Sequence, residues 1–126
     1  MVLRSAGKLS PDGYADRLRE AAVGVSLMVS PHPSYPPLEM AHLGMLVVTN
    51  RFGPKDLATW HPNITSVGDL RPETVADAIA AACRRFDEDP GAGDREAAVA
   101  TAFTSNEPQF PFAAELAAEL EAGTRD

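Results

Sequence analysis

Cysteine, aromatic residues and basic charge are all scarce in this chain of 126 residues. The single cysteine, Cys83, excludes an internal disulfide and favours a reducing compartment, so we expect a cytoplasmic protein. No run of apolar residues approaches the length of about 18 that spans a membrane, and the N-terminus lacks a signal-peptide core. Eleven basic against 18 acidic side chains give a net charge of −7, which argues against nucleic acid or anionic lipid as a partner.

The acidic charge is concentrated at one end of the chain. Residues 1–86 carry nine basic and eight acidic side chains, whereas residues 87–126 carry two and ten. The length predicts one small domain, and an apolar content of 44% is sufficient for a core. We therefore predict a domain over residues 1–86, a Pro- and Gly-containing linker over 87–93, and an acidic helical segment over 94–126 that packs on the domain or extends from it.

Strand and helix signals alternate along the chain and predict an α/β fold. Strands are predicted at residues 2–6, 23–29, 45–49 and 63–67, and helices start at Ser10, Ser34 and Pro72. Segment 23–29 is apolar at nearly every position, which is typical of a parallel strand covered on both faces. The order predicts right-handed βαβ units in a partial Rossmann-like parallel sheet of about three or four strands, flanked by helices. Two further helices are expected at 94–103 and 112–122.

One segment carries the chemistry: residues 30–41, Ser-Pro-His-Pro-Ser-Tyr-Pro-Pro-Leu-Glu-Met-Ala. It leads from the end of a predicted strand into a predicted helix, and ligands of open α/β sheets bind at that edge. The N–H groups and dipole of a helix start favour phosphate. Because the two adjacent prolines donate nothing, the predicted donors are the backbone groups of Ser34, Tyr35, Leu38 and Glu39, with the Ser34 hydroxyl.

The carboxylate of Glu39 indicates the class of ligand. It would repel a phosphate but suits a neighbouring diol, as an acidic residue does for ribose in dinucleotide-binding folds. A nucleotide or nucleotide-sugar therefore fits better than a simple phosphate ester. The alternative is that Glu39 only complements the helix dipole.

Other side chains remain open to two interpretations. His32, in the crevice loop, is either a ligand-binding or a solvated side chain. Arg51 and Lys55 either reach a phosphate from the loop after the third strand or are ordinary loop charges. Cys83 falls on the apolar stripe of the helix that starts at Pro72, and we expect it to be a buried small hydrophobe. The histidines have no metal-ligand spacing, so no metal site is predicted.

The segment Pro-Pro-Leu-Glu-Met-Ala (36–41), followed by Gly44 and Leu-Val-Val-Thr-Asn (46–50), resembles the donor-binding motif of retaining glycosyltransferases with the GT-B fold. It is most similar to rhamnosyltransferase-type members, and the likeness extends from about residue 5 to residue 82. The resemblance implies that the donor is a nucleoside-diphosphate hexose, with rhamnose as one candidate sugar, and the acceptor a glycan of polysaccharide biosynthesis. It implies no metal and no other cofactor.

The resemblance also implies roles for individual residues. Glu39 matches the family's glutamate that binds ribose hydroxyls, and backbone amides near Ser34 and Tyr35, with that of Leu38, would hold the diphosphate. The loop that flanks the base corresponds to Gly7, Lys8 and Leu9. Many relatives carry a second glutamate eight positions before the first, where this chain has Pro31. Sugar recognition is therefore expected to differ, with His32 and Pro33 nearest the donor sugar.

Two parts of the family pattern have no counterpart in this chain: an acceptor-binding N-terminal domain and the first two βα units of the donor domain. We therefore expect weak or absent transfer by the chain alone. The alternative function is a non-catalytic nucleotide-binding or oligomerisation module derived from a glycosyltransferase. Without the missing strands, segment 23–29 would have a bare apolar edge, which predicts a homodimer formed by edge pairing or by a strand swap.

Overall fold

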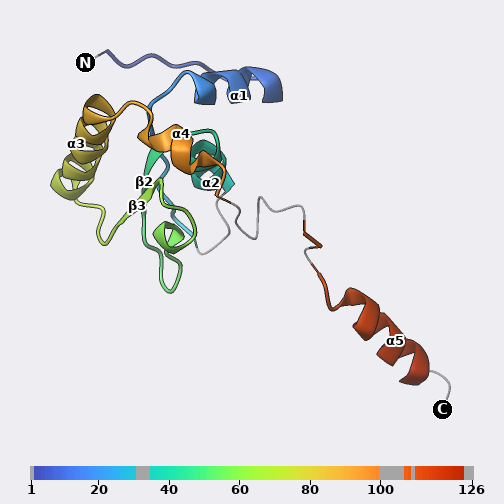
Figure 1. The fold of residues 1–126 in the computed structure, drawn as a ribbon. Coiled ribbons are helices and arrows are strands. Elements are labelled where there is room, and N and C mark those ends of the chain that lie inside the picture. The colour runs from blue at the N-terminus through green and yellow to red at the C-terminus, as the bar shows by residue number, and fades with distance from the viewer. Residues whose placement is uncertain (1, 31–34, 100–106, 109, 124–126) are drawn as a thin grey trace.

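The computed structural model describes residues 2–30, 35–99, 107, 108 and 110–123 as a parallel α/β unit followed by a separate helix (Figure 1). Strands β1 (Val23–Val25), β2 (Leu46–Asn50) and β3 (Ile64–Val67) form a parallel sheet in the order β1-β2-β3. The helices are α1 (Pro11–Arg19), α2 (Tyr35–His42), the short η1 (Leu57–Thr59), α3 (Pro72–Glu88), α4 (Ala92–Ala97) and α5 (Ala113–Gly123). The predicted fold class, a partial Rossmann-like parallel sheet flanked by helices, is confirmed.

The central strand β2 is buried along its whole length and separates two apolar clusters. On one face, Val47 packs with residues of α1 and α2, including Leu18 and Leu38. On the other face, Val48 packs under α3 with Ala82. Burial of both faces explains why this strand is apolar at consecutive positions rather than at alternating ones.

Local signals in the sequence set the helix ends. The hydroxyl of Ser10 caps α1 by accepting a hydrogen bond from the Gly13 N–H at 3.2 Å, as predicted. Helix α2 is followed by Gly44 at φ +91°, a backbone conformation that favours glycine and allows the chain to turn into β2. Proline opens both α1 and α3, where its missing N–H costs no helical hydrogen bond.

Three expectations are corrected by the structure. Residues 2–6 form no strand: they are exposed and pair with no described strand, and an isolated segment with strand propensity has no ladder to join. The predicted strand 23–29 pairs as a ladder only over Val23–Val25. Cys83 is exposed rather than buried, because α3 buries the flank of its stripe that faces β2 and leaves Cys83 at the border.

The predicted linker contains the end of α3 and the start of α4, and α4 packs closely on α2. A Cβ on Gly93 would lie 1.9 Å from the Gly44 carbonyl oxygen, so the two backbones are in direct contact. The buried Asn63 amide donates to the carbonyls of Ala41 at 3.1 Å and Gly93 at 2.9 Å. Residues up to α4 therefore belong to the packed unit, whereas α5 lies apart from it and buries no residue (Figure 1). The division at residues 86 and 94 stays a prediction.

His61 lies next to this contact and is 1% exposed. Its Nδ1 accepts a hydrogen bond from the Asn63 N–H at 3.1 Å, and its Nε2 has no hydrogen-bond partner among the described residues. Burial and, to a lesser extent, the charge of His42 hold the pKa of His61 below its ordinary value of 6.5, although the Ala97 carbonyl and the Glu96 charge act to raise it. The folded state therefore favours the neutral imidazole.

We expect this pKa shift to make the protein less stable in mild acid. Since the unfolded chain takes up the proton at about pH 6.5 and the folded chain only at lower pH, the stabilisation is complete above pH 6.5. It is lost as the pH falls from there through the folded pKa, at about 1.4 kcal/mol for each unit of difference. Urea unfolding at pH 7.5 and 5.5 measures the loss.

A matched pair of variants assigns the pH dependence to its histidine. His61→Gln should reduce the difference in unfolding free energy between the two pH values, although it lowers stability at both. His42→Gln, at an exposed position of α2, should reduce the difference by less, because burial rather than the charge of His42 is the largest cause of the lowered His61 pKa. A wild-type pH dependence in His61→Gln would contradict the assignment.

Candidate functional site

The start of α2 lies at the carboxyl end of the parallel sheet, where the sequence analysis places the ligand. Tyr35 is the first residue of α2 and is 53% exposed, whereas Leu38 is buried against the sheet. Since the second and third residues of the helix are prolines, α2 has fewer free N–H groups than an ordinary helix start. The predicted partners Ser34, His32 and Pro33 lie outside the described residues, as does Pro31.

Glu39 is an exposed residue of the second turn of α2, and its neighbour is a tyrosine of α1. Partial burial, together with the charge of Glu39 and a hydrogen bond to it, raises the pKa of the Tyr14 phenol. The phenol therefore remains a hydrogen-bond donor to the carboxylate at neutral pH. Tyr14 of α1 and Glu39 of α2 therefore lie close together, and the sequence contained no signal for this proximity because the two residues are far apart along the chain.

The side chain of Asn50, at the end of β2, fixes the start of the loop that leads to α2. Its Oδ1 accepts from the Met28 N–H at 2.5 Å and its Nδ2 donates to the Met28 carbonyl at 3.0 Å. The amide thus forms the two hydrogen bonds that a neighbouring strand would form, and Asn50 itself is buried. The polypeptide is thus held beside the end of β2 as far as Met28.

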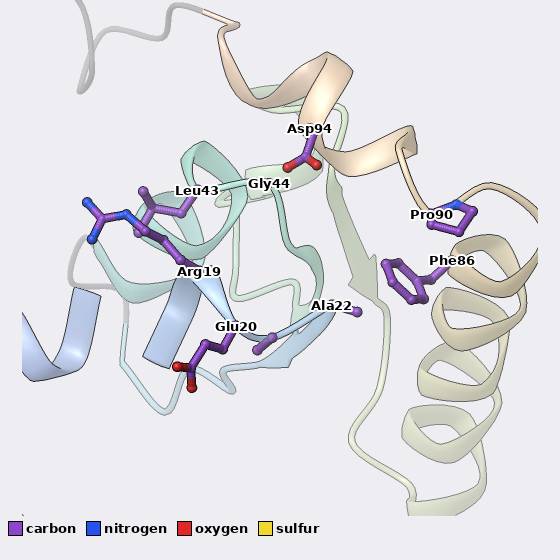
Figure 2. A pocket seen from close by; sticks show the side chains of 9 residues that line it. Arg19, Glu20, Ala22, Leu43, Gly44, Phe86, Pro90 and Asp94 are labelled. Carbon is purple, nitrogen blue, oxygen red and sulfur yellow. The ribbon is translucent and has the colours of Figure 1, made fainter. Parts of the chain in front are cut away.

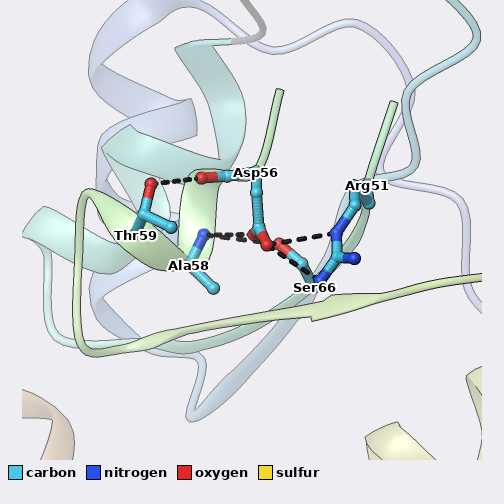
Figure 3. Close-up of polar contacts among 5 residues, drawn as sticks. All are labelled: Arg51, Asp56, Ala58, Thr59 and Ser66. Carbon is cyan, nitrogen blue, oxygen red and sulfur yellow. Dashed lines mark hydrogen bonds and ion pairs between the residues drawn. The ribbon is translucent and has the colours of Figure 1, made fainter. Parts of the chain in front are cut away.

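The loop after β2 is stabilised by the carboxylate of Asp56 (Figure 3). Asp56 caps η1 through the Ala58 N–H at 3.1 Å and pairs with Arg51 at 3.1 Å. The pKa of Asp56 is lowered, mainly by a hydrogen bond from Ser66 and further by the Ala58 N–H and Arg51, although partial burial acts to raise it. Arg51 therefore has a structural partner, which supports the interpretation of this residue as a loop charge.

The third part of the predicted site precedes α1. Gly7, at φ +63°, and Lys8 and Leu9 lie in an exposed segment without regular secondary structure. The Gly7 N–H donates to the Ser5 hydroxyl at 3.3 Å. Their predicted role beside a base stays a prediction.

A cavity of about 150 Å³ lies at the opposite, amino end of the sheet (Figure 2). Figure 2 shows the side chain of Asp94 over Gly44, with Phe86 and Pro90 on the α3 side and Leu43 on the α2 side. The residues before β1 and β2 contribute to its wall. Because ligands of open parallel sheets bind at the carboxyl end, this cavity is not the predicted nucleotide site.

No group of three or more His, Cys, Asp or Glu side chains within the described part of the chain is arranged to hold a metal ion. None of the helices in that part has the length and apolar character needed to cross a membrane.

The fold and the position of α2 define a Rossmann-like α/β domain with a carboxylate near the carboxyl end of its sheet. The family model of the WsaF C-terminal domain matches residues 1–80, and the chain belongs to this family of glycosyltransferase-associated domains. The matched residues include β1 to β3, α2 and all the predicted site residues. No curated protein sequence matches the chain at a significant level.

Proposed function

We propose that this chain is the donor-nucleotide-binding part of a retaining GT-B glycosyltransferase that transfers a hexose, with rhamnose as the first candidate, to a glycan. The observation that carries the proposal is the exposed carboxylate of Glu39, which lies near Tyr14 on a helix that starts at the carboxyl end of a parallel sheet. The family membership of residues 1–80 supports the same function.

In this proposal the protein binds and positions the donor. Glu39 accepts hydrogen bonds from the ribose hydroxyls, and the start of α2 lies toward the diphosphate, where its N–H groups and dipole stabilise the charge that develops as the sugar leaves. The base lies beside Gly7, Lys8 and Leu9. Transfer without metal or cofactor, and weak transfer by the chain alone, both belong to the proposal.

Calorimetric titration with the diphosphates of uridine, thymidine and guanosine tests it. We expect one of them to bind, and Glu39→Ala to weaken binding at least about tenfold, because hydrogen bonds to a charged group contribute roughly 1.5–3 kcal/mol. Glu73→Ala is the matched control, since it removes the same charge from an exposed site in the first turn of α3. Its affinity should equal that of the wild type.

Two outcomes would contradict the proposal. Equal affinities of Glu39→Ala and wild type would remove Glu39 from the site. Failure of all three nucleotides to bind to the folded chain would favour the alternative, a non-catalytic oligomerisation module.

A further inference from the structure

The outer edge of β1 exposes backbone hydrogen-bonding groups and apolar side chains together. Within the part of the chain that the structure describes, β1 pairs with β2 on one edge and with no strand on the other. The side chains of Val25 and Leu27 are 43% and 44% exposed. Residues 21–30 contain no charged residue and no proline, so this edge lacks the features that protect edge strands from association.

Hydrogen bonds to β2 show which backbone groups face outward. The Ala22 carbonyl accepts from the Leu46 N–H at 2.9 Å, and the Ser26 N–H donates to the Val48 carbonyl at 3.0 Å. Met28 bonds to the side chain of Asn50 through both its N–H and its carbonyl. Since alternate residues of an extended strand direct these groups to opposite edges, the even-numbered residues from 22 to 28 face β2.

The odd-numbered residues therefore direct their N–H and carbonyl groups to the free edge. Three of them, Val23, Val25 and Leu27, lie within the extended segment that Asn50 holds in place. Their side chains project on the α3 side of the sheet, because Val23 packs against the α3 cluster and the same face recurs every second residue. The free edge thus offers three apolar side chains and six backbone groups in register.

This edge is complementary to itself in the antiparallel direction. With a two-fold axis at Val25, each Val25 exchanges two hydrogen bonds with the Val25 of the second copy. Val23 then lies opposite Leu27 of the second copy, and Leu27 opposite its Val23. Every outward-facing group in the segment is paired, and every cross-strand pair is apolar on the α3 side.

We infer that two copies of this chain associate through β1 to form one continuous six-stranded sheet, with Val25 at the two-fold axis. The strands within each copy are parallel and the central pair is antiparallel. Neither the start of α2 nor Glu39 is among the residues that pair across the interface. The association therefore does not depend on nucleotide binding.

Light scattering coupled to size-exclusion chromatography tests the association. We expect the wild type at about 100 µM to elute with twice the chain mass of 13.4 kDa. Val25→Lys should raise the dissociation constant at least about tenfold, because it places two like charges opposite each other at the axis. Val29→Lys is the matched control: the same change at a position that is 89% exposed and outside the paired residues should leave the dimer intact.

Hydrogen exchange tests the register and does not depend on any variant. In the dimer the amides of Val25 and Leu27 should be protected, and their protection should fall on dilution. The Ser26 amide, which bonds to β2, should remain protected at every concentration.

Three results would overturn the inference. The first is that the wild type is a monomer. A monomer with protected Val25 and Leu27 amides counts as well, because the chain's own residues 2–6 would then cover the edge. The second is a dimer that Val25→Lys does not weaken. The third is a dimer whose Val25 and Leu27 amides exchange freely, which also decides the question if Val25→Lys does not fold.

Discussion

Gly93→Ala is expected to disrupt the packing of α4 on α2. The added Cβ would lie 1.9 Å from the Gly44 carbonyl oxygen and 2.9 Å from its carbonyl carbon. Both are backbone atoms, so no side-chain rotation relieves the overlap and one helix has to move. Overpacking of this kind costs about 1–3 kcal/mol or more, and the displaced Gly93 carbonyl also loses its hydrogen bond from Asn63.

Thermal unfolding followed by circular dichroism measures the effect. For a unit of this size, about 3 kcal/mol corresponds to a fall in Tm of more than about 10 °C. Gly68→Ala is the control, because a Cβ there has no atom within 4 Å, and Gly91→Ala tests the cap of the same helix, where a Cβ meets only side-chain atoms of Arg95 and Asp89. A Tm for Gly93→Ala within about 2 °C of the controls would show that α4 does not pack on α2 in solution.

Asn63→Asp is expected to destabilise the protein strongly with almost no change of shape. The asparagine amide donates to two carbonyl oxygens, and an aspartate oxygen in its place would face both of them as an unpaired negative charge. Asn63 is 2% exposed, so water cannot compensate. Removing the donor and burying the charge together should cost on the order of 3–5 kcal/mol at neutral pH.

The buried charge in Asn63→Asp makes the free energy of unfolding depend on pH. This dependence distinguishes the effect of the charge from the effect of lost packing. Asn63→Asp should recover part of its stability between pH 8 and pH 5, because a protonated carboxyl donates one hydrogen bond again, whereas Asn63→Ala should show no such recovery. Denaturant titration gives both free energies, and Thr65→Ala, at an exposed position of β3, is the control. An Asn63→Asp protein as stable as the control would contradict the contact.

Elements with a local cause could be predicted from the sequence. The cap at Ser10, the proline at the start of α3 and the glycine after α2 each act on the backbone within a few residues, so their consequences are visible in the chain order. The apolar runs of β1 and β2 predicted a parallel sheet for the same reason. The strand predicted at residues 2–6 was wrong because strand formation requires a neighbour, which propensity does not supply.

The candidate site divides in the same way. Glu39 could be found because its distance from the helix start and from the prolines is a local pattern. Its contact with Tyr14 could not, and neither could the partner that Arg51 has in Asp56. The first contact depends on which faces of α1 and α2 meet, and the second on the way the loop after β2 folds.

The sequence by itself determined the α/β class, the starts of α1 and α3 and the position of Glu39 near the start of α2, since each follows from interactions between near neighbours in the chain. Only the tertiary structure decided that α4 belongs to the packed unit and that Cys83 is exposed. The first feature arises from the close approach of Gly93 to Gly44 and from the side chain of Asn63, which bonds to carbonyls 22 and 30 residues away, and the second from the way α3 packs on β2. Hydrogen bonds over such separations leave no periodic trace in the sequence.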